Sequence, residues 1–163
     1  MRALVLADTH LRPDRRRTLP EQVWREAGAA DVVLHAGDVL TADLLEQLGE
    51  LAPVHAVLGN NDLTLVGTLP EVLELELGGV TVAMVHDSGP RSGRPGRMKR
   101  RFPGASVVVY GHSHLPEDIE GIQGQRLFNP GSCTERRRAP ERTYGVLELE
   151  DGKLLEHRIV PLP

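Results

Sequence analysis

The chain has a single cysteine, Cys133, so no intramolecular disulfide can support its fold. We interpret Cys133 as a small buried apolar residue rather than a nucleophile, because no neighbouring side chain is suited to activate its thiol. The sequence also lacks an apolar run long enough to cross a membrane and lacks the apolar segment of a signal peptide. These absences predict a soluble cytoplasmic protein.

Aromatic residues make up only 3% of the chain, and its formal net charge is -4. Nucleic-acid-binding surfaces combine positive charge with aromatic stacking platforms, so this composition argues against such a surface. Positive charge is concentrated in three short runs, at residues 15–17, 97–101 and 136–138. Most runs of this kind are solvated loops, but they keep a nuclease open as an alternative function.

The length of 163 residues fits one domain, because a chain of this size can bury most of the surface that it exposes when unfolded. We find no repeat, low-complexity segment or composition shift that would mark a linker. The sequence therefore predicts a single domain over residues 1–163.

Three apolar runs in the first part of the chain predict strands that are covered on both faces, because they show no polar alternation. They are Arg2–Ala7, Asp31–Asp38 and Val54–Leu58. Helical segments between consecutive runs imply right-handed parallel crossovers, which bring the carboxyl ends of the strands to one edge of a sheet. Open α/β folds bind their ligands at that edge.

Two helices are expected between these strands. The first would begin with Thr18 as its cap and Glu21 three residues later, and would end near Gly28. The second would be capped by Thr41. One face of this second helix would carry the leucines at positions 44, 45, 48 and 51.

The later part of the chain reads as a meander of hairpins. Gly78-Gly79 separates two runs, Leu73–Leu77 and Val80–Val85, and Asp151-Gly152 separates two more, Thr143–Glu150 and Lys153–Val160. Between these hairpins we expect an exposed loop at 88–96, a short helix with Met98 and Phe102, a strand at 107–109 and a hairpin turning near Gly124. We infer an α/β fold of two sheets packed face to face, with helices on the outer faces.

Most of the apolar runs are followed by polar residues that are oxygen or imidazole ligands. In chain order these candidate metal ligands are Asp8, His10, Asp38, Asn60, His86, His112 and His114. The set suits Mn²⁺, Fe²⁺ or Zn²⁺, and its lack of thiolates argues against a structural zinc cluster. Seven ligands suit two ions if one carboxylate bridges them. Two ions about 3.5–4 Å apart can generate hydroxide and bind phosphoryl oxygens, so the set indicates phosphoester hydrolysis.

The ordered motifs resemble those of the calcineurin-like metallophosphoesterases, and more narrowly those of the small single-domain bacterial and archaeal phosphodiesterase branch of that family. The matching stretches are Asp8-Thr9-His10, Gly37-Asp38, Gly59-Asn60-Asn61-Asp62, His86 and Gly111-His112-Ser113-His114. Asn129-Pro130-Gly131-Ser132 also matches a stretch typical of this branch. The resemblance implies a four-layer α/β/β/α sandwich with two mixed sheets.

The resemblance also implies a ligand arrangement and a set of catalytic residues. Asp8, His10, Asp38 and His114 would hold one ion, while Asp38, Asn60, His86 and His112 would hold the other, with Asp38 as the bridge. Catalytic roles would fall to Asp38, Asn60, Asp62 and His112, with Asp62 orienting a ligand or a water. Mn²⁺ is the expected cofactor, and Ni²⁺, Fe²⁺ or Zn²⁺ are alternatives.

Two positions depart from the family pattern. Asn61 stands where many larger members have a histidine that protonates the leaving group, and an amide cannot replace that general acid. Asp87 stands where a glycine usually follows the ligand histidine, so we expect a local difference in the backbone or in the groups behind the ligands. Because Asn61 cannot protonate a leaving group, we expect hydrolysis to be fastest for leaving groups that need little protonation.

The favoured function is a metal-dependent phosphodiesterase acting on a small or exposed phosphodiester in an open cleft. The arginines of 91–101 either help to bind that substrate or are solvated loop charge. An alternative is a protein-binding scaffold of the same fold, as in the eukaryotic retromer subunit. Exposed hairpin edges allow a homo-oligomer. We expect structural roles for His35, His55 and His157.

Overall fold

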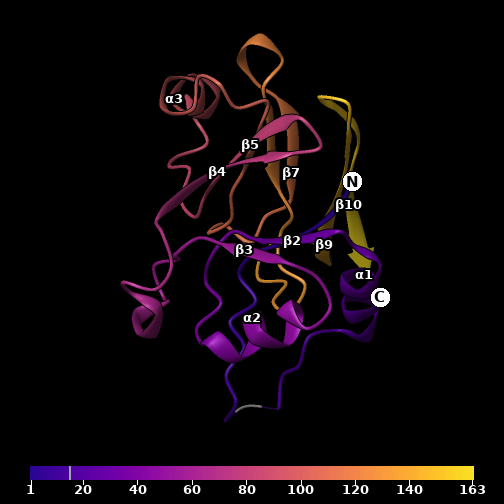
Figure 1. Cartoon of the computed structure of the whole chain (residues 1–163). Coiled ribbons are helices and arrows are strands. Elements are labelled where there is room, and N and C mark those ends of the chain that lie inside the picture. The colour runs from indigo at the N-terminus through magenta and orange to yellow at the C-terminus, as the bar shows by residue number, and fades with distance from the viewer. Residues whose placement is uncertain (15) are drawn as a thin grey trace.

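The computed structural model describes residues 1–14 and 16–163, so Arg15 of the first arginine run lies outside the described residues. Its strands form two five-stranded sheets (Figure 1). The strand order is β10-β9-β1-β2-β3 in the first sheet and β4-β5-β6-β8-β7 in the second. Both sheets contain parallel and antiparallel pairs, which confirms the predicted mixed sheets.

The first sheet is built on three parallel strands, as the apolar runs predict. They are β1 (Arg2–Leu6), β2 (Val32–His35) and β3 (Val54–Ala56), joined through helices α1 (Glu21–Ala29) and α2 (Ala42–Gly49). The closing hairpin, β9 (Arg142–Glu150) and β10 (Lys153–Leu162), adds two antiparallel strands beside β1. This order places the carboxyl ends of β1, β2 and β3 at one edge of the sheet.

The second sheet contains the predicted hairpins but is not a simple meander. Its elements are β4 (Val72–Leu77), β5 (Val80–Val85), α3 (Arg94–Arg101), β6 (Val107–Val109), β7 (Glu117–Glu120) and β8 (Arg126–Asn129). Strands β5, β6 and β8 are parallel to one another, because α3 and β7 each provide part of a crossover. Two short 3-10 helices, at Leu63–Leu65 and Ile122–Gly124, lie in connections.

The layers follow from where the apolar side chains lie. One buried cluster fills the space between the sheets, with Val5, Val82 and Phe128 among its members. A second cluster packs α1 and α2 against the first sheet, and a third packs α3 against the second sheet. The result is the α/β/β/α order that the resemblance implies, with α1 and α2 on one outer face and α3 on the other (Figure 1).

Several predicted helix boundaries are wrong. Helix α1 has Pro20 at its N-cap position rather than Thr18, whereas its end at Ala29 is next to the expected end at Gly28. Thr41 does occupy the N-cap of α2, but its side chain makes no capping hydrogen bond. Leu51 follows the end of α2 and is 47% exposed, because the helix ends before the fourth leucine can join the apolar face.

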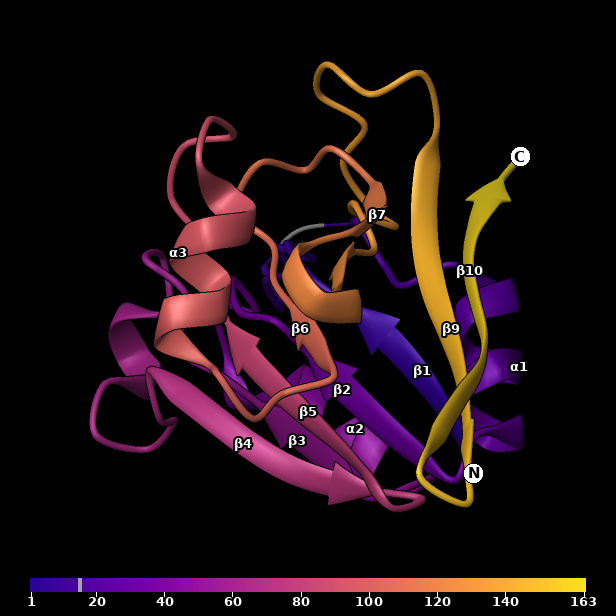
Figure 2. The same cartoon turned by 90° about the horizontal axis from the view of Figure 1, so that it is seen from above.

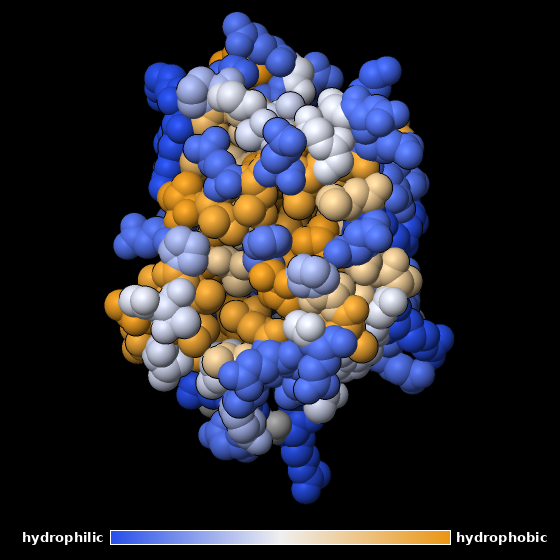
Figure 3. Space-filling view, in the orientation of Figure 1, coloured by the Kyte–Doolittle hydropathy of each residue, from blue (hydrophilic) through white to orange (hydrophobic). Residues whose placement is uncertain are grey.

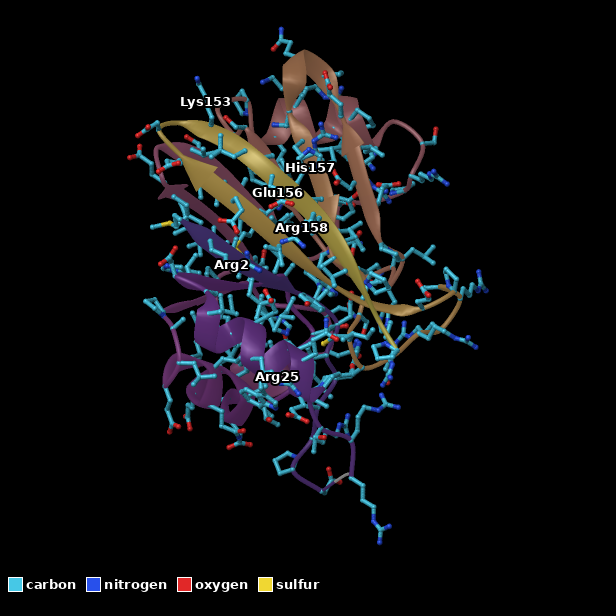
Figure 4. All side chains as sticks on the ribbon, turned by 90° about the vertical axis from the view of Figure 1, so that its right-hand side faces the viewer. Arg2, Arg25, Lys153, Glu156, His157 and Arg158 are labelled. Carbon is cyan, nitrogen blue, oxygen red and sulfur yellow. The ribbon has the colours of Figure 1, made fainter. Side chains whose placement is uncertain are left out.

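The edges of the sandwich differ on its two sides. On one side the Nδ1 atom of His157 of β10, a residue labelled in Figure 4, lies 2.5 Å from Asp118 Oδ2 of β7. This contact joins the two sheets. On the other side β3 and β4 are the terminal strands of their sheets. Figure 3 shows an apolar band across the face on which β3 and β4 lie.

Among the described residues, no helix has the length and apolar character needed to span a membrane.

Both sheets send loops to the same edge of the molecule. The arrowheads of β1 and β5 point toward the same side in Figure 2. The loops after β1, β2 and β3 carry the first candidate ligands, and the segments after β5 and β6 carry the histidines. The fold thus brings the predicted motifs together where the two sheets meet.

Candidate metal centre

The backbone at the candidate ligands is unusual. Five of them adopt positive φ angles: Asp8 (53°), His10 (45°), Asp38 (59°), His112 (70°) and His114 (58°). Residues other than glycine rarely adopt this left-handed conformation, and such strain gathers at functional sites. In the loops after β1 and β6 one residue separates the two ligands, so each short motif presents two side chains to the same place. The sharp turns explain how so few residues supply so many donors.

Glycines allow the loops to approach one another closely. A Cβ at Gly59 would lie 2.1 Å from the backbone nitrogen of Asp38, and one at Gly37 would lie 2.7 Å from His86 Nδ1. A Cβ at Gly111 would lie 3.0 Å from Asp8 Oδ2. Each of these glycines precedes a candidate ligand in the sequence, so the motif glycines have a steric reason.

The first group of donors consists of Asp8, His10 and His114. The Nε2 atoms of His10 and His114 are 3.2 Å apart, and His114 Nε2 is 3.5 Å from Asp8 Oδ1. The two rings are stacked, with centroids 5.0 Å apart. These atoms come from the loops after β1 and β6, so this group spans the two sheets.

The second group of donors consists of Asp8, Asp38 and His86. Asp38 Oδ2 lies 3.5 Å from His86 Nε2 and 3.4 Å from His10 Nε2, so this carboxylate stands between the two groups. Asp8 Oδ1 lies 4.0 Å from the Nε2 atoms of both His10 and His86. Asp8 is therefore also shared, whereas the resemblance assigned it to one ion alone.

Asn60 and His112 lie beside the second group. Asn60 Oδ1 is 3.0 Å from His86 Nε2 and 2.9 Å from His112 Nδ1. His86 Nδ1 donates a hydrogen bond to the carbonyl of Ala36 at 2.7 Å, so the Nε2 of neutral His86 carries a lone pair. Acceptor atoms that converge at such distances repel one another unless a cation or a proton lies between them. The structure thus brings all seven predicted ligands into one cluster.

The electrostatics of the cluster fit a bound cation. Burial raises the pKa of Asp8 to about 7, and Asp8 Oδ2 is buried without a hydrogen-bond partner among the described residues. Burial also lowers the pKa of His114 to about 4, which keeps its ring neutral. At Asp38 burial raises the pKa, whereas the neighbouring His86 ring and the hydrogen bonds from Asn61 lower it and hold it below the usual range. Two buried carboxylates and neutral imidazoles are suitable ligands for divalent metal ions.

Asp62 acts behind the ligands rather than among them. Its buried carboxylate accepts hydrogen bonds from the backbone N–H groups of Asp38 (2.9 Å), Gly59 (2.7 Å) and Leu40 (2.7 Å). These bonds fix the loops after β2 and β3 relative to each other. The geometry therefore gives Asp62 a positioning role, which agrees with the expectation that it orients a ligand.

The turn at residues 129–132 fixes the other two loops. The side-chain amide of Asn129 donates to the carbonyl of Gly111 at 3.1 Å, and Ser132 Oγ donates to the carbonyl of Asp8 at 2.8 Å. Thr134 Oγ1 adds a bond to the carbonyl of Thr9 at 2.7 Å. This stretch therefore connects the loop after β1 to the loop after β6.

The two departures from the family pattern have clear surroundings. The side-chain amide of Asn61 donates to Asp38 Oδ2 at 2.7 Å, so this residue contacts a candidate ligand directly. Asp87 is exposed, and its Oδ1 accepts a hydrogen bond from the N–H of Gly89 at 2.7 Å. Asp87 therefore shapes the loop after β5.

The arginines near the site differ from those expected. Arg94 and Arg97 donate to backbone carbonyls of the 88–93 loop, at Gly89 (3.2 Å) and Ser88 (2.8 Å), so they hold that loop. A hollow next to His10 is instead lined by Arg12 and Arg17. Arg17 was expected only as part of the charged run at 15–17, and Arg12 belongs to no motif. Their position beside His10 depends on how the long loop after β1 folds.

Comparisons with known proteins agree with this geometry. A family model for the calcineurin-like phosphoesterase superfamily domain matches residues 1–152. A probable metallophosphoesterase of Methanocaldococcus jannaschii is 35% identical over 161 residues, which are 97% of this chain and 80% of that protein.

Solved structures also share the fold. Vps29 of Entamoeba histolytica, in a complex with Zn²⁺, has a TM-score of 0.79 at 23% identity, and the match covers 99% of this chain and 98% of the Vps29 chain. An archaeal phosphodiesterase has a TM-score of 0.71 at 20% identity, over 99% of this chain and 100% of its own. The sequence match over almost the whole domain is the stronger finding, and it shows that the chain belongs to the calcineurin-like phosphoesterase superfamily.

Proposed function

We propose that this protein is a metal-dependent phosphodiesterase that hydrolyses a small or exposed phosphodiester. The observation that carries the proposal is the position of Asp38 Oδ2, which lies 3.4 Å from His10 Nε2 and 3.5 Å from His86 Nε2. One carboxylate oxygen between two groups of donors is the arrangement that a bridged pair of ions requires. Membership of the phosphoesterase superfamily supports the same chemistry.

We propose that residues 1–163 act as one domain with two divalent ions. Asp8, His10, Asp38 and His114 would hold one ion, and Asp38, Asn60, His86 and His112 the other. Oxygen and imidazole ligands fit Mn²⁺ as the first choice, with Ni²⁺, Fe²⁺ or Zn²⁺ as alternatives. When bound, two such ions would supply a nucleophile from water and offset charge on the phosphoryl group.

The chain's own residues have separate tasks in this proposal. Asp38 and Asn60 fix the centre from the loops after β2 and β3, and Asp62 holds those loops in place through three backbone N–H groups. The Nδ1 atom of His112 is 2.9 Å from Asn60 Oδ1, and the His112 side chain is exposed, so it would lie where the substrate enters. Asn61 faces Asp38, and its amide cannot act as a general acid toward a leaving group, because it does not titrate in the useful pH range.

Two other functions have less support. A scaffold protein of this fold needs no metal ligands, whereas here seven donor side chains converge and Asp8 Oδ2 is buried without a partner among the described residues. A nuclease would use the arginine runs to bind a nucleic-acid backbone, but in the segment before and within α3 Arg94 and Arg97 are held by loop carbonyls. Arg137 of the last run faces Glu135 at 3.4 Å.

The test is metal-dependent hydrolysis by the purified, metal-stripped protein. Mn²⁺, Ni²⁺, Zn²⁺ or Mg²⁺ is added back, and bis(4-nitrophenyl) phosphate is compared with 4-nitrophenyl phosphate as substrate. We expect metal-stimulated turnover that favours the diester. Turnover that favours the monoester would refute the diesterase assignment, and no metal-stimulated turnover on either would leave the scaffold as the better account.

A further inference from the structure

A cavity of about 510 Å³ lies between the loop after β1 and the helices α1 and α2, with Leu19, Trp24 and Leu44 in its wall. In Figure 1 these elements form the lower side of the molecule. Leu19 and Leu44 are buried in the core, and the partly buried Trp24 packs against the same cluster, so the apolar wall is fixed. Thr41 and Gln47 add polar groups to the wall. The volume and the mixed lining are those of a small-molecule site. We call it the Trp24 cavity.

The Trp24 cavity adjoins the candidate metal centre. A smaller hollow of about 260 Å³ is lined by His10, Leu40 and Glu135, and both spaces share Arg12 and Arg17. The two walls are also continuous along the chain, because the next residues after His10 and Leu40 line the larger cavity. A ligand with one end at His10 can therefore extend into the Trp24 cavity.

Two arginines line both spaces, and one carboxylate lies in the wall of each, Asp43 in the larger and Glu135 in the smaller. Arg17 donates a hydrogen bond to Glu135, whose other carboxylate oxygen lies 3.8 Å from His114 Nδ1. Arg12 lines both spaces beside it. Guanidinium groups bind phosphoryl oxygens well, so these two arginines offer donors to an anionic group that lies between the apolar pocket and the metal centre.

We propose that the substrate carries a bulky, planar aromatic substituent, about the size of a nucleoside, that occupies the Trp24 cavity and packs on the indole. Arg12 and Arg17 contact the anionic oxygens of the substrate, and Gln47 and Thr41 bind polar atoms of the substituent. This inference rests on the proposed phosphodiesterase function, because it places the phosphoryl group at His10.

The first test uses two diesters with the same leaving group, so that only the retained substituent differs. They are methyl 4-nitrophenyl phosphate and the 4-nitrophenyl ester of thymidine 5′-monophosphate. We expect kcat/KM of the Mn²⁺-loaded protein to be at least about tenfold higher for the thymidine ester, through a lower KM, because aromatic packing contributes this much. Equal values for the two esters would overturn the proposal.

Three variants locate the preference. Trp24→Leu keeps an apolar side chain but removes the ring, so it should reduce the ratio of the two kcat/KM values. Arg12→Gln removes a cation that would contact the oxygens common to both esters, so it should lower both kcat/KM values. Arg25→Gln is the matched control. Arg25 is an exposed arginine on α1, the helix that carries Trp24; it pairs with Glu21 and lines neither space. It should leave the ratio unchanged. An unchanged ratio in Trp24→Leu would overturn the proposal.

The second test needs no turnover. Trp24 is the single tryptophan of the chain, so its fluorescence reports on this cavity directly. We expect thymidine 5′-monophosphate to change the fluorescence saturably, and inorganic phosphate not to. No change up to millimolar concentration would overturn the proposal. If neither ester is hydrolysed with any metal, the proposed function fails, and this titration still decides whether the cavity binds the aromatic group.

Discussion

The side-chain amide of Asn61 donates a hydrogen bond to Asp38 Oδ2 at 2.7 Å, while the backbone N–H of Asn61 donates to Asp38 Oδ1 at 2.9 Å. Residue 61 thus holds both oxygens of the carboxylate that stands between the two groups of donors. The same amide cannot protonate a leaving group, because it does not titrate in the useful pH range. One residue therefore orients a candidate ligand and leaves the site without a general acid at this position.

Substrates with acidic leaving groups are expected to react fastest. Across a series of aryl phosphodiesters, kcat/KM of the wild-type protein should fall steeply as the pKa of the leaving group rises. Asn61→His should make this dependence shallower and should speed the poorest leaving groups by at least about tenfold, because a general acid typically contributes 10²-fold or more. A flat dependence in the wild-type protein would contradict the role given to Asn61.

Asp62→Asn tests the support behind the ligands. The amide cannot accept hydrogen bonds from all three N–H groups that Asp62 now holds, so we expect about 2 kcal/mol lower stability and roughly 10- to 100-fold weaker metal binding. Denaturant unfolding and competition with a chelating dye measure the two effects. Asp151→Asn is the control, because Asp151 lies exposed in the last hairpin turn with a φ of 49°, which asparagine tolerates. Unchanged metal affinity in Asp62→Asn would contradict the positioning role.

Gly59→Ala should displace Asp38. The added Cβ would lie 2.1 Å from the Asp38 backbone nitrogen and 2.2 Å from its Oδ1, so one loop must move. We expect turnover to fall by at least about 100-fold, as in other cases where catalytic geometry shifts by about 1 Å. Gly28→Ala is the matched change in α1, where a Cβ meets no atom within 4 Å. That variant should keep its activity and gain up to about 1 kcal/mol of stability. Equal activity in the two variants would show that the loops need not touch.

His35 should make the protein sensitive to acid. It is fully buried beside Thr9 Oγ1 at 3.0 Å, and burial lowers its pKa from 6.5 to about 3. The unfolded chain then binds a proton that the folded chain rejects, so stability is complete above pH 6.5 and is lost as the pH falls toward 3. The loss approaches about 1.4 kcal/mol per pH unit for one such group.

The matched variant for this effect is His35→Gln, which can still bind Thr9. Unfolding of the metal-free proteins at pH 7.5 and pH 5 should show a smaller loss of stability in the variant than in the wild type. The other histidines are common to both proteins, so their contribution cancels in the comparison. An equal loss in both would show that His35 titrates normally.

The sequence predicted the candidate site better than it predicted the ends of the elements. Each motif follows an apolar run, and strand ends of one sheet meet at one edge for reasons that local sequence already contains. The boundary at Leu51 depended on tertiary packing, since the leucine spacing continues past the point where α2 ends. The parallel pairing of β5, β6 and β8 depended on crossovers that hairpin patterns do not reveal.

Other features required the three-dimensional structure. The sequence does not show that Asp8 approaches both donor groups, because this depends on positive φ angles in loops from two sheets. The sequence did not place Arg12 or Arg17, a member of the 15–17 run, at the site, because both reach it only through the fold of a loop. By contrast, the expectation that His35 is packed and hydrogen-bonded is confirmed.

The most direct measurement is a titration of the metal-free protein with Mn²⁺, in which bound metal and hydrolysis of bis(4-nitrophenyl) phosphate are followed together. If Asp38 bridges two ions, the wild-type protein should bind two equivalents and gain most of its turnover with the second. Asp38→Ala should bind neither tightly and should lose turnover by at least about 1,000-fold, since a ligand of both ions is removed. Full turnover at one equivalent, or near-normal turnover in Asp38→Ala, would contradict the bridged two-metal centre.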